Sequence, residues 1–321
     1  MKNKKRLIAL ISSVVILILS ISFGNSVSVN KKSDDNSFVK SLLNKEITGS
    51  KIVLRDGDSS NVIQRIKVKG TIDDAMADEE AAYSVINQIH MAKNDPNVKA
   101  ILLVVDSPGG GVYESNELYN ALVKSGKDVY VSMESLAASG GYYISMAAKK
   151  IYAHQETITG SIGVIMSNLS AQQFLNEHGI KNQIIRSGEQ KAVGGLTEDM
   201  NEATIATYKE LNLESYNRFV DLIAKGRNMD REKVLSLADG RIYSAEQALK
   251  NGLIDKIASQ KELISDIEAD KKISNAQVVE YKAIDVNAGL LNRFINGLSK
   301  SIVKEIQSAS AETNIQRNYL G

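Results

Sequence analysis

The sequence predicts an α/β protein with a largely parallel sheet and flanking helices. The first observation is an uninterrupted, β-rich apolar run at Ala100–Val105, which is typical of a strand buried on both faces. The second is the alternation of such runs with helical patterns along the middle of the chain. The third is a glycine-rich turn, Gly109–Gly111, soon after the buried run. Strands that alternate with helices usually pair in parallel, because each helix returns the chain to the same edge of the sheet.

The periodicity of apolar residues places the individual elements. Ordered structure is expected to begin near Ile52. Strands are predicted at residues 62–72, 100–105, 129–132, 150–153 and 182–185. Helices are predicted at residues 78–92, 114–124, 140–148, 171–178, 198–225, 231–238 and 244–251. An apolar stripe at residues 288–307 predicts a further amphipathic helix, which would pack on its own domain, on a partner or on the membrane surface.

Composition excludes several classes of protein. The chain has 321 residues, of which 43% are hydrophobic and 24% charged, as in ordinary globular proteins. The net charge of +1 indicates no nucleic-acid partner. The absence of cysteine rules out disulfides, thiol nucleophiles and cysteine-ligated metals. The three histidines lack metal-ligand spacing, so we expect neither a metal site nor a cofactor.

The first residues have the pattern of a membrane segment. A basic run at residues 2–6 precedes an apolar stretch, Leu7–Phe23, which only serines interrupt. Its 17 residues lie at the lower edge of what spans a bilayer, yet exceed the apolar core of about 7–15 residues in a cleaved signal peptide. We therefore expect an uncleaved N-terminal transmembrane helix, with the basic flank inside and the rest of the chain outside. A cleaved signal peptide is the alternative.

These patterns divide the chain into four parts. Residues 1–28 comprise the basic flank and the membrane anchor, and residues 29–50 form a polar linker. Residues 51–285 form the main domain. Residues 286–321 form the amphipathic helix and a flexible tail.

Two glycine-rich motifs in the main domain suit acyl-transfer chemistry. Residues 106–111 (DSPGGG) follow the buried strand, and their glycines let backbone N–H groups approach a ligand closely. This motif fits a tight turn, a phosphate cradle or an oxyanion hole, although no Lys-Ser/Thr pair follows it as in a P-loop. Ser139 opens the predicted helix at 140–148, where it is either a helix N-cap or a nucleophile.

Lys191 lies 52 positions after Ser139, also among glycines, with Ser161 between them. A serine hydroxyl needs a base to attack a carbonyl, and a lysine serves as that base only while it is neutral. Taken singly, Lys191 fits a surface lysine and Ser161 a turn hydroxyl. A Ser-His-Asp site is a further alternative, but His154 follows Ser139 by only 15 residues and nothing in the sequence pairs it with a carboxylate.

Together, the motifs at residues 106–111, 136–143, 159–164 and 186–195 resemble, in this order and spacing, the signal peptide peptidase A family of membrane-anchored bacterial Ser/Lys peptidases. The resemblance covers about residues 60–260 and matches the short, single-domain form of that family. One departure is residues 192–195 (AVGG), where the family often has a more polar segment that contains proline.

The resemblance implies a role for each of five residues. By it, Ser139 is the nucleophile, Lys191 the general base and Ser161 the group that orients the lysine. Gly109 and the N–H of Gly140 match the positions that form the oxyanion hole in related folds.

The resemblance also implies a fold, a setting and a set of partners. The expected fold is like that of Clp protease and crotonase, in a homo-oligomer that encloses a chamber and shares each active site between subunits. The expected protein is a membrane-anchored endopeptidase, with its catalytic domain on the extracytoplasmic side. It would degrade remnant signal peptides and other apolar peptides. The alternatives are a non-catalytic or an acyl-transfer member of the crotonase-like fold, although the extracytoplasmic location argues against an enzyme that uses CoA.

Overall fold

The structure, a computed structural model, describes residues 50–79, 81 and 83–282. The predicted anchor, nearly all of the linker, and the C-terminal helix and tail lie outside the described residues. Between residues 50 and 282, no helix is both long and apolar enough to cross a membrane.

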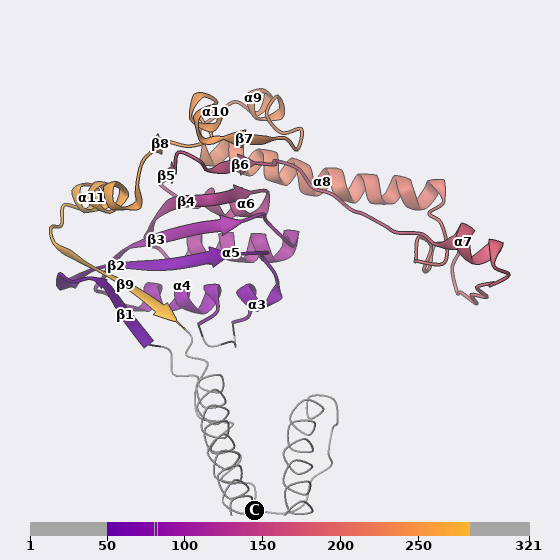
Figure 1. Ribbon diagram of the computed structural model, residues 1–321, viewed down its shortest axis with the longest axis horizontal. Helices are drawn as coiled ribbons and strands as arrows, with labels where there is room; N and C mark the ends of the chain where they lie inside the picture. The colour runs from indigo at the N-terminus through magenta and orange to yellow at the C-terminus, as the bar shows by residue number, and fades with distance from the viewer. Residues whose placement is uncertain (1–49, 80, 82, 283–321) are drawn as a thin grey trace, which may run out of the picture. The chain divides into compact units, whose positions relative to one another are not determined.

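The described residues form a nine-stranded, mostly parallel sheet (Figure 1). Its strands are β1 (Ser50–Arg55), β2 (Asp58–Lys69), β3 (Val98–Ser107), β4 (Asp128–Ala138), β5 (Lys150–Ala153), β6 (Ile158–Gly160), β7 (Ile242–Ser244), β8 (Lys256–Ile257) and β9 (Ala276–Lys282). The order is β1-β9-β2-β3-β4-β5-β8, and β6 pairs with β4 and β7. Within this sheet only the β1–β9 and β6–β7 pairs are antiparallel. The predicted α/β class with a largely parallel sheet is confirmed.

Helices cover both faces of the sheet. They are α3 (Asp74–Ala77), α4 (Val85–Asn94), α5 (Val112–Lys124), α6 (Gly140–Ser145), α7 (Gln172–Glu177), α8 (Glu202–Gly226), α9 (Arg231–Leu235), α10 (Ala245–Lys250) and α11 (Gln260–Lys271). Helices α4, α5 and α6 pack on one face, and α11 packs on the other.

The alternation of side chains along β3 explains the uninterrupted apolar run that predicted it. Ile101, Leu103 and Val105 belong to the core beneath α4, α5 and α6. Leu102 and Val104 belong to the core beneath α11. Because both faces are covered, a polar residue within the run 100–105 would cost buried apolar surface on one face or the other.

Three sequence predictions differ from the structure. The helix predicted at 78–92 begins only at Val85 as α4, because the Ser84 hydroxyl accepts a hydrogen bond from Asn87 N at 3.1 Å and starts the helix there. The strand predicted at 182–185 is wrong, because this segment pairs with no strand of the described residues. Finally, β4 is longer than the predicted 129–132 and ends at Ala138.

Candidate active site

Ser139 sits at the junction between β4 and α6 in a backbone conformation that is unusual for serine. Its φ is 52° and its ψ is −117°. Its N–H donates to the Gly160 carbonyl at 2.8 Å, and its own carbonyl accepts from Tyr143 N at 2.8 Å. Ser139 occupies the N-cap position of α6, but its side chain makes no capping hydrogen bond, so the hydroxyl is not committed to the helix. Positive φ costs a non-glycine residue of order 1–3 kcal/mol, and such strain often marks a functional residue.

The glycine loop packs directly against this serine. Gly109 has φ +97°, and a Cβ on it would lie 2.6 Å from Gly140 N and 2.9 Å from Ser139 Cβ. The Gly109 carbonyl accepts from Ile72 N at 3.0 Å, and Gly111 N donates to the Ile72 carbonyl at 2.9 Å. The loop is therefore fixed to the chain after β2 and leaves no room for a side chain beside Ser139.

The hydrogen bonds of the loop distinguish two neighbouring N–H groups. Gly109 N donates to Ser107 Oγ at 3.1 Å, so this group is already engaged. Gly110 N donates to no atom of the described residues, and it would lie 3.2 Å from a Cβ built on Gly140. The resemblance indicated Gly109 and not Gly110, because a run of glycines does not reveal which N–H is left without an acceptor. The expectation for Gly109 itself stays a prediction.

We predict that Gly109→Ala lowers the turnover number kcat by about 100-fold or more, because the new methyl group must push Ser139 and Gly140 away from the glycine loop. Gly70→Ala is the matched control. Gly70 also has positive φ, +86°, but nothing lies within 4 Å of its Cβ position. Both variants carry the left-handed strain, so peptide hydrolysis measured side by side separates strain from contact with Ser139. Equal activities would contradict the prediction.

Ser161 lies beside Ser139 because β6 pairs with the end of β4. The pairing matches Ala138 with Gly160, which is the residue before Ser161. Ser161 also has positive φ, 48°, and its N–H donates to the Arg241 carbonyl at 2.8 Å. Two serines with positive φ thus follow the ends of two paired strands.

Lys191, in contrast, lies far from Ser139 within the same chain. Its neighbour Gln190 accepts a hydrogen bond from Thr204 Oγ1 at 2.6 Å, close to the start of α8. The Phe219 ring lies 5.1 Å from that of Tyr143, one turn of α6 after Ser139. Thr204 and Phe219 are 15 residues apart, or about 22 Å along the helix axis.

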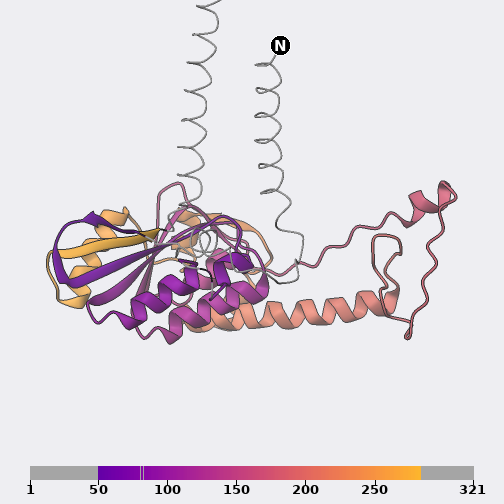
Figure 2. The same cartoon turned by 90° about the horizontal axis from the view of Figure 1, so that it is seen from below.

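Figures 1 and 2 show α8 running away from the sheet, with α7 beyond its far end. Lys191 is exposed on this arm, which comprises residues 163–201. No lysine side chain spans the separation to Ser139, so a Ser–Lys pair cannot form within one chain in this arrangement.

His154 does not complete a Ser-His-Asp site. It is exposed and lines a cavity of about 280 Å³ together with Glu134, Glu156 and five other residues. Its ring makes no hydrogen bond to a carboxylate of the described residues. Across the same part of the chain, no three His, Asp or Glu side chains lie close enough together to hold a metal ion.

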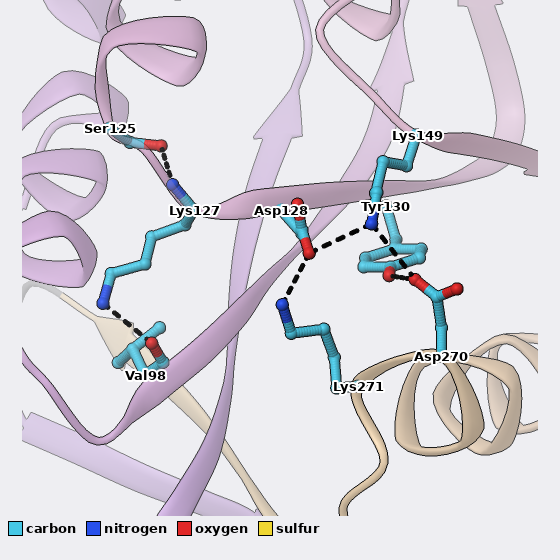
Figure 3. Close-up of polar contacts among 8 residues, drawn as sticks. All are labelled: Val98, Ser125, Lys127, Asp128, Tyr130, Lys149, Asp270 and Lys271. Atoms are coloured by element: carbon cyan, nitrogen blue, oxygen red, sulfur yellow. Dashed lines mark hydrogen bonds and ion pairs between the residues drawn. The ribbon is translucent and has the colours of Figure 1, made fainter.

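A cluster of ionisable groups with shifted pKa values lies at the other end of β4 (Figure 3). Asp128 accepts hydrogen bonds from Lys271 at 2.6 Å and Lys149 at 3.2 Å. Burial raises the pKa of Asp128, but these two bonds outweigh it and hold the pKa below its usual value. Burial and a hydrogen bond to Asp270 raise the pKa of Tyr130.

These groups fasten α11 to the sheet. A carboxylate with a lowered pKa stabilises the fold above its unfolded pKa, and this contribution is lost as the pH falls. Because Asp128 begins β4 and Ser139 follows its end, the cluster is too remote to act on a substrate at Ser139.

Comparisons with known proteins show the family to which the chain belongs. The family described as "Peptidase family S49" matches residues 121–274, and "Clp protease" matches residues 58–159. A candidate signal peptide peptidase SppA of Enterococcus faecium is 36% identical, over 87% of this chain and 85% of its own. Protease 4 of Haemophilus influenzae is 33% identical over 81% of this chain but only 45% of its own.

Among solved structures, a mutant ClpP1 from Listeria monocytogenes covers 62% of this chain and 92% of its own, with 17% identity and a TM-score of 0.43. The length and identity of the match to the Enterococcus faecium protein decide the family. The chain belongs to peptidase family S49, and it is a serine protease.

Proposed function

We propose that this protein is a membrane-anchored endopeptidase in which Ser139 of one subunit and Lys191 of another form the catalytic pair. Its substrates are remnant signal peptides and other apolar peptides. One observation carries the proposal. Ser139 has a strained backbone and a side chain that makes no capping hydrogen bond, and it lies beside a glycine loop in which Gly110 N donates to no atom of the described residues.

The proposed reaction begins when neutral Lys191 takes the proton of Ser139 Oγ as that oxygen attacks the scissile carbonyl. The N–H groups of Gly140 and Gly110 stabilise the negative oxygen of the tetrahedral intermediate. Collapse releases the amine product, which receives the proton from Lys191, and leaves an acyl group on Ser139. A water molecule, deprotonated by the same lysine, then hydrolyses this ester.

The exposed state of Lys191 supports a site shared between subunits. A lysine acts as a base when its amine is buried, because burial disfavours the charged form. Among the residues that the structure describes, none buries Lys191, which lies on the arm at residues 163–201. Contact with a second subunit would supply both the burial and the serine.

The arm has the surface of a protein interface. Its exposed apolar side chains are too numerous for a surface left in water. They are Ile165, Met166, Leu169, Phe174, Ile180, Ile184, Ile185 and Leu196. We propose that another copy of this chain covers them in a homo-oligomer.

Apolar substrates fit the residues around the serine. Val112 and Tyr113, which follow the glycine loop, are exposed, and so is Ile158 on β6. The Enterococcus faecium relative is named for signal peptides, which agrees with this class of substrate.

A covalent serine-directed probe tests the proposed nucleophile. A fluorophosphonate should modify the full-length protein at Ser139, and peptide mass mapping should find the adduct there. Modification of a different serine, or none in a preparation that cleaves peptides, would overturn the assignment.

The proposed anchor rests on the apolar stretch at residues 7–23. Protease added to intact protoplasts should digest the main domain if it lies outside the membrane. Full protection would contradict the orientation, and a mature N-terminus near Asn25 would contradict the uncleaved anchor.

We predict that Ser161→Ala lowers kcat about 10-fold or more and changes KM little. Its proposed task is to hold the lysine amine toward Ser139, and losses of positioning are seen in the chemical step. Steady-state kinetics with an apolar peptide measure both constants. A large rise in KM at unchanged kcat would identify Ser161 as a substrate contact instead.

A further inference from the structure

We infer that Asp106 is a positioning residue that holds the strand end bearing Ser139 in register with the glycine loop. Asp106 belongs to β3, three residues before Gly109, and its side chain reaches across to β4. This inference rests on the proposed role of Ser139 as the nucleophile.

The contact occurs where the pairing of β3 and β4 is irregular. Val105 pairs with Met133 and Ser107 with Ala137, so β4 contains two more residues than β3 in this interval. The extra residues form a bulge at residues 134–136. A bulge bends its strand and redirects the residues that follow.

Asp106 closes the bulge from one side. Its Oδ1 accepts hydrogen bonds from Ser135 Oγ at 2.6 Å and from Leu136 N at 3.3 Å. The buried Thr157 closes it from the other side, where its Oγ1 donates to the carbonyls of Met133 at 3.2 Å and Glu134 at 2.5 Å. Side-chain hydrogen bonds therefore hold the bulge in place where the regular backbone pairing of β3 and β4 is interrupted.

The bulge also decides which strand β4 meets. Before it, Tyr130 to Met133 pair with β5, and from its last residue onward, Leu136 to Ala138 pair with β6. The second pairing brings Gly160 to Ser139 and thereby places Ser161 beside the nucleophile.

One carboxylate oxygen thus joins the two halves of the site. The donor Gly110 lies four residues after Asp106, and Ser139 lies three residues after Leu136. Catalysis needs donors about 2.7–3.1 Å from the developing oxyanion. A displacement of about 1 Å can reduce the rate 100-fold. Loss of the Asp106 contact would loosen the spacing between nucleophile and donor without removing either.

The two printed bonds require an acceptor but not a charge. Asp106→Asn keeps a carbonyl oxygen at the position of Oδ1, whereas Asp106→Ala removes it. The experiment compares these two variants of the full-length protein by kcat and KM for an apolar peptide, and by the rate of fluorophosphonate labelling of Ser139. Glu134→Ala is the matched control, because it removes a carboxylate from the same bulge that makes no hydrogen bond within the described residues.

We expect Asp106→Ala to lower kcat and the labelling rate by about 10- to 100-fold with KM within about twofold. Asp106→Asn should recover at least about a third of the wild-type values, and Glu134→Ala should match the wild type. Wild-type kinetics of Asp106→Ala would overturn the inference. An asparagine variant as slow as the alanine variant would overturn it as well, since a charge would then be required.

If Asp106→Ala fails to assemble, Ser135→Ala decides the question, because it removes the shorter of the two bonds on the exposed side of the bulge. Its kcat should fall about threefold at unchanged KM, and an unchanged kcat would overturn the inference. A failure of the proposed function would be seen in a different variant. In that case Ser139→Ala would remain active, independently of the kinetics of the Asp106 variants.

Discussion

Ser139→Ala is expected to reduce peptide hydrolysis by roughly a million-fold, the scale seen when a serine protease loses its nucleophile. Without the hydroxyl no acyl-enzyme forms, and the remaining oxyanion donors act only on attack by water. The strain at φ 52° belongs to the backbone and remains in the variant, so the fold and the oligomer should be unchanged.

Hydrolysis of an apolar peptide by purified protein measures the effect, and sedimentation measures assembly. Ser236→Ala, at an exposed serine that ends α9, is the matched control and should retain full activity. Turnover of Ser139→Ala above a few per cent of wild type would remove this serine from its role.

Lys191→Ala and Lys191→Arg should both be inactive, since a guanidinium stays charged at any usable pH and cannot accept the serine proton. Lys181→Ala, at another exposed lysine of the same arm, should remain active. Retained activity in Lys191→Arg would exclude a lysine base.

The separation of Lys191 from Ser139 makes a sharper test possible. Chains that carry Ser139→Ala and chains that carry Lys191→Ala, co-expressed in equal amounts, should regain hydrolysis. With random assembly around a ring, about a quarter of the sites combine an intact serine with an intact lysine from the neighbour. If the pair formed within one chain, no mixture would contain a complete site, and mixed oligomers without activity would therefore refute the shared site.

The buried centre of the fold was predictable from local pattern. The apolar run at 100–105 identified β3, and the amphipathic spacing at 198–225 identified α8 almost to its ends. Both depend on periodicity, which a single sequence records directly. The sheet order was not accessible in this way, because β9 pairs with β1 and β2 across more than 200 residues of chain.

The errors have identifiable physical causes. The segment at 182–185 is rich in isoleucine, but a strand needs a partner and the described residues supply none. The end of β4 was missed because Glu134 and Ser135 are polar and exposed, as expected where a bulge interrupts a buried strand.

The site residues were proposed from motifs, whose spacing indicates a reaction but not a geometry. The sequence could nominate Ser139, Ser161 and Lys191, yet it could not show that the first two follow the ends of paired strands while the third lies near the far end of α8. The proposed oxyanion donor is Gly110 rather than Gly109, because the Ser107 hydroxyl accepts the hydrogen bond of Gly109 N. The sequence does not reveal this contact.

The length of α8 has a consequence for the life of the protein in the cell. A helix of 25 residues holds the proposed base away from the nucleophile of its own chain. If the base comes from a second subunit, as proposed, a newly made subunit lacks a complete site and should be inactive on its own. Peptidase activity would then depend on the concentration of subunits, because only an assembled oligomer holds complete sites. Isolated or damaged chains would not cleave neighbouring proteins.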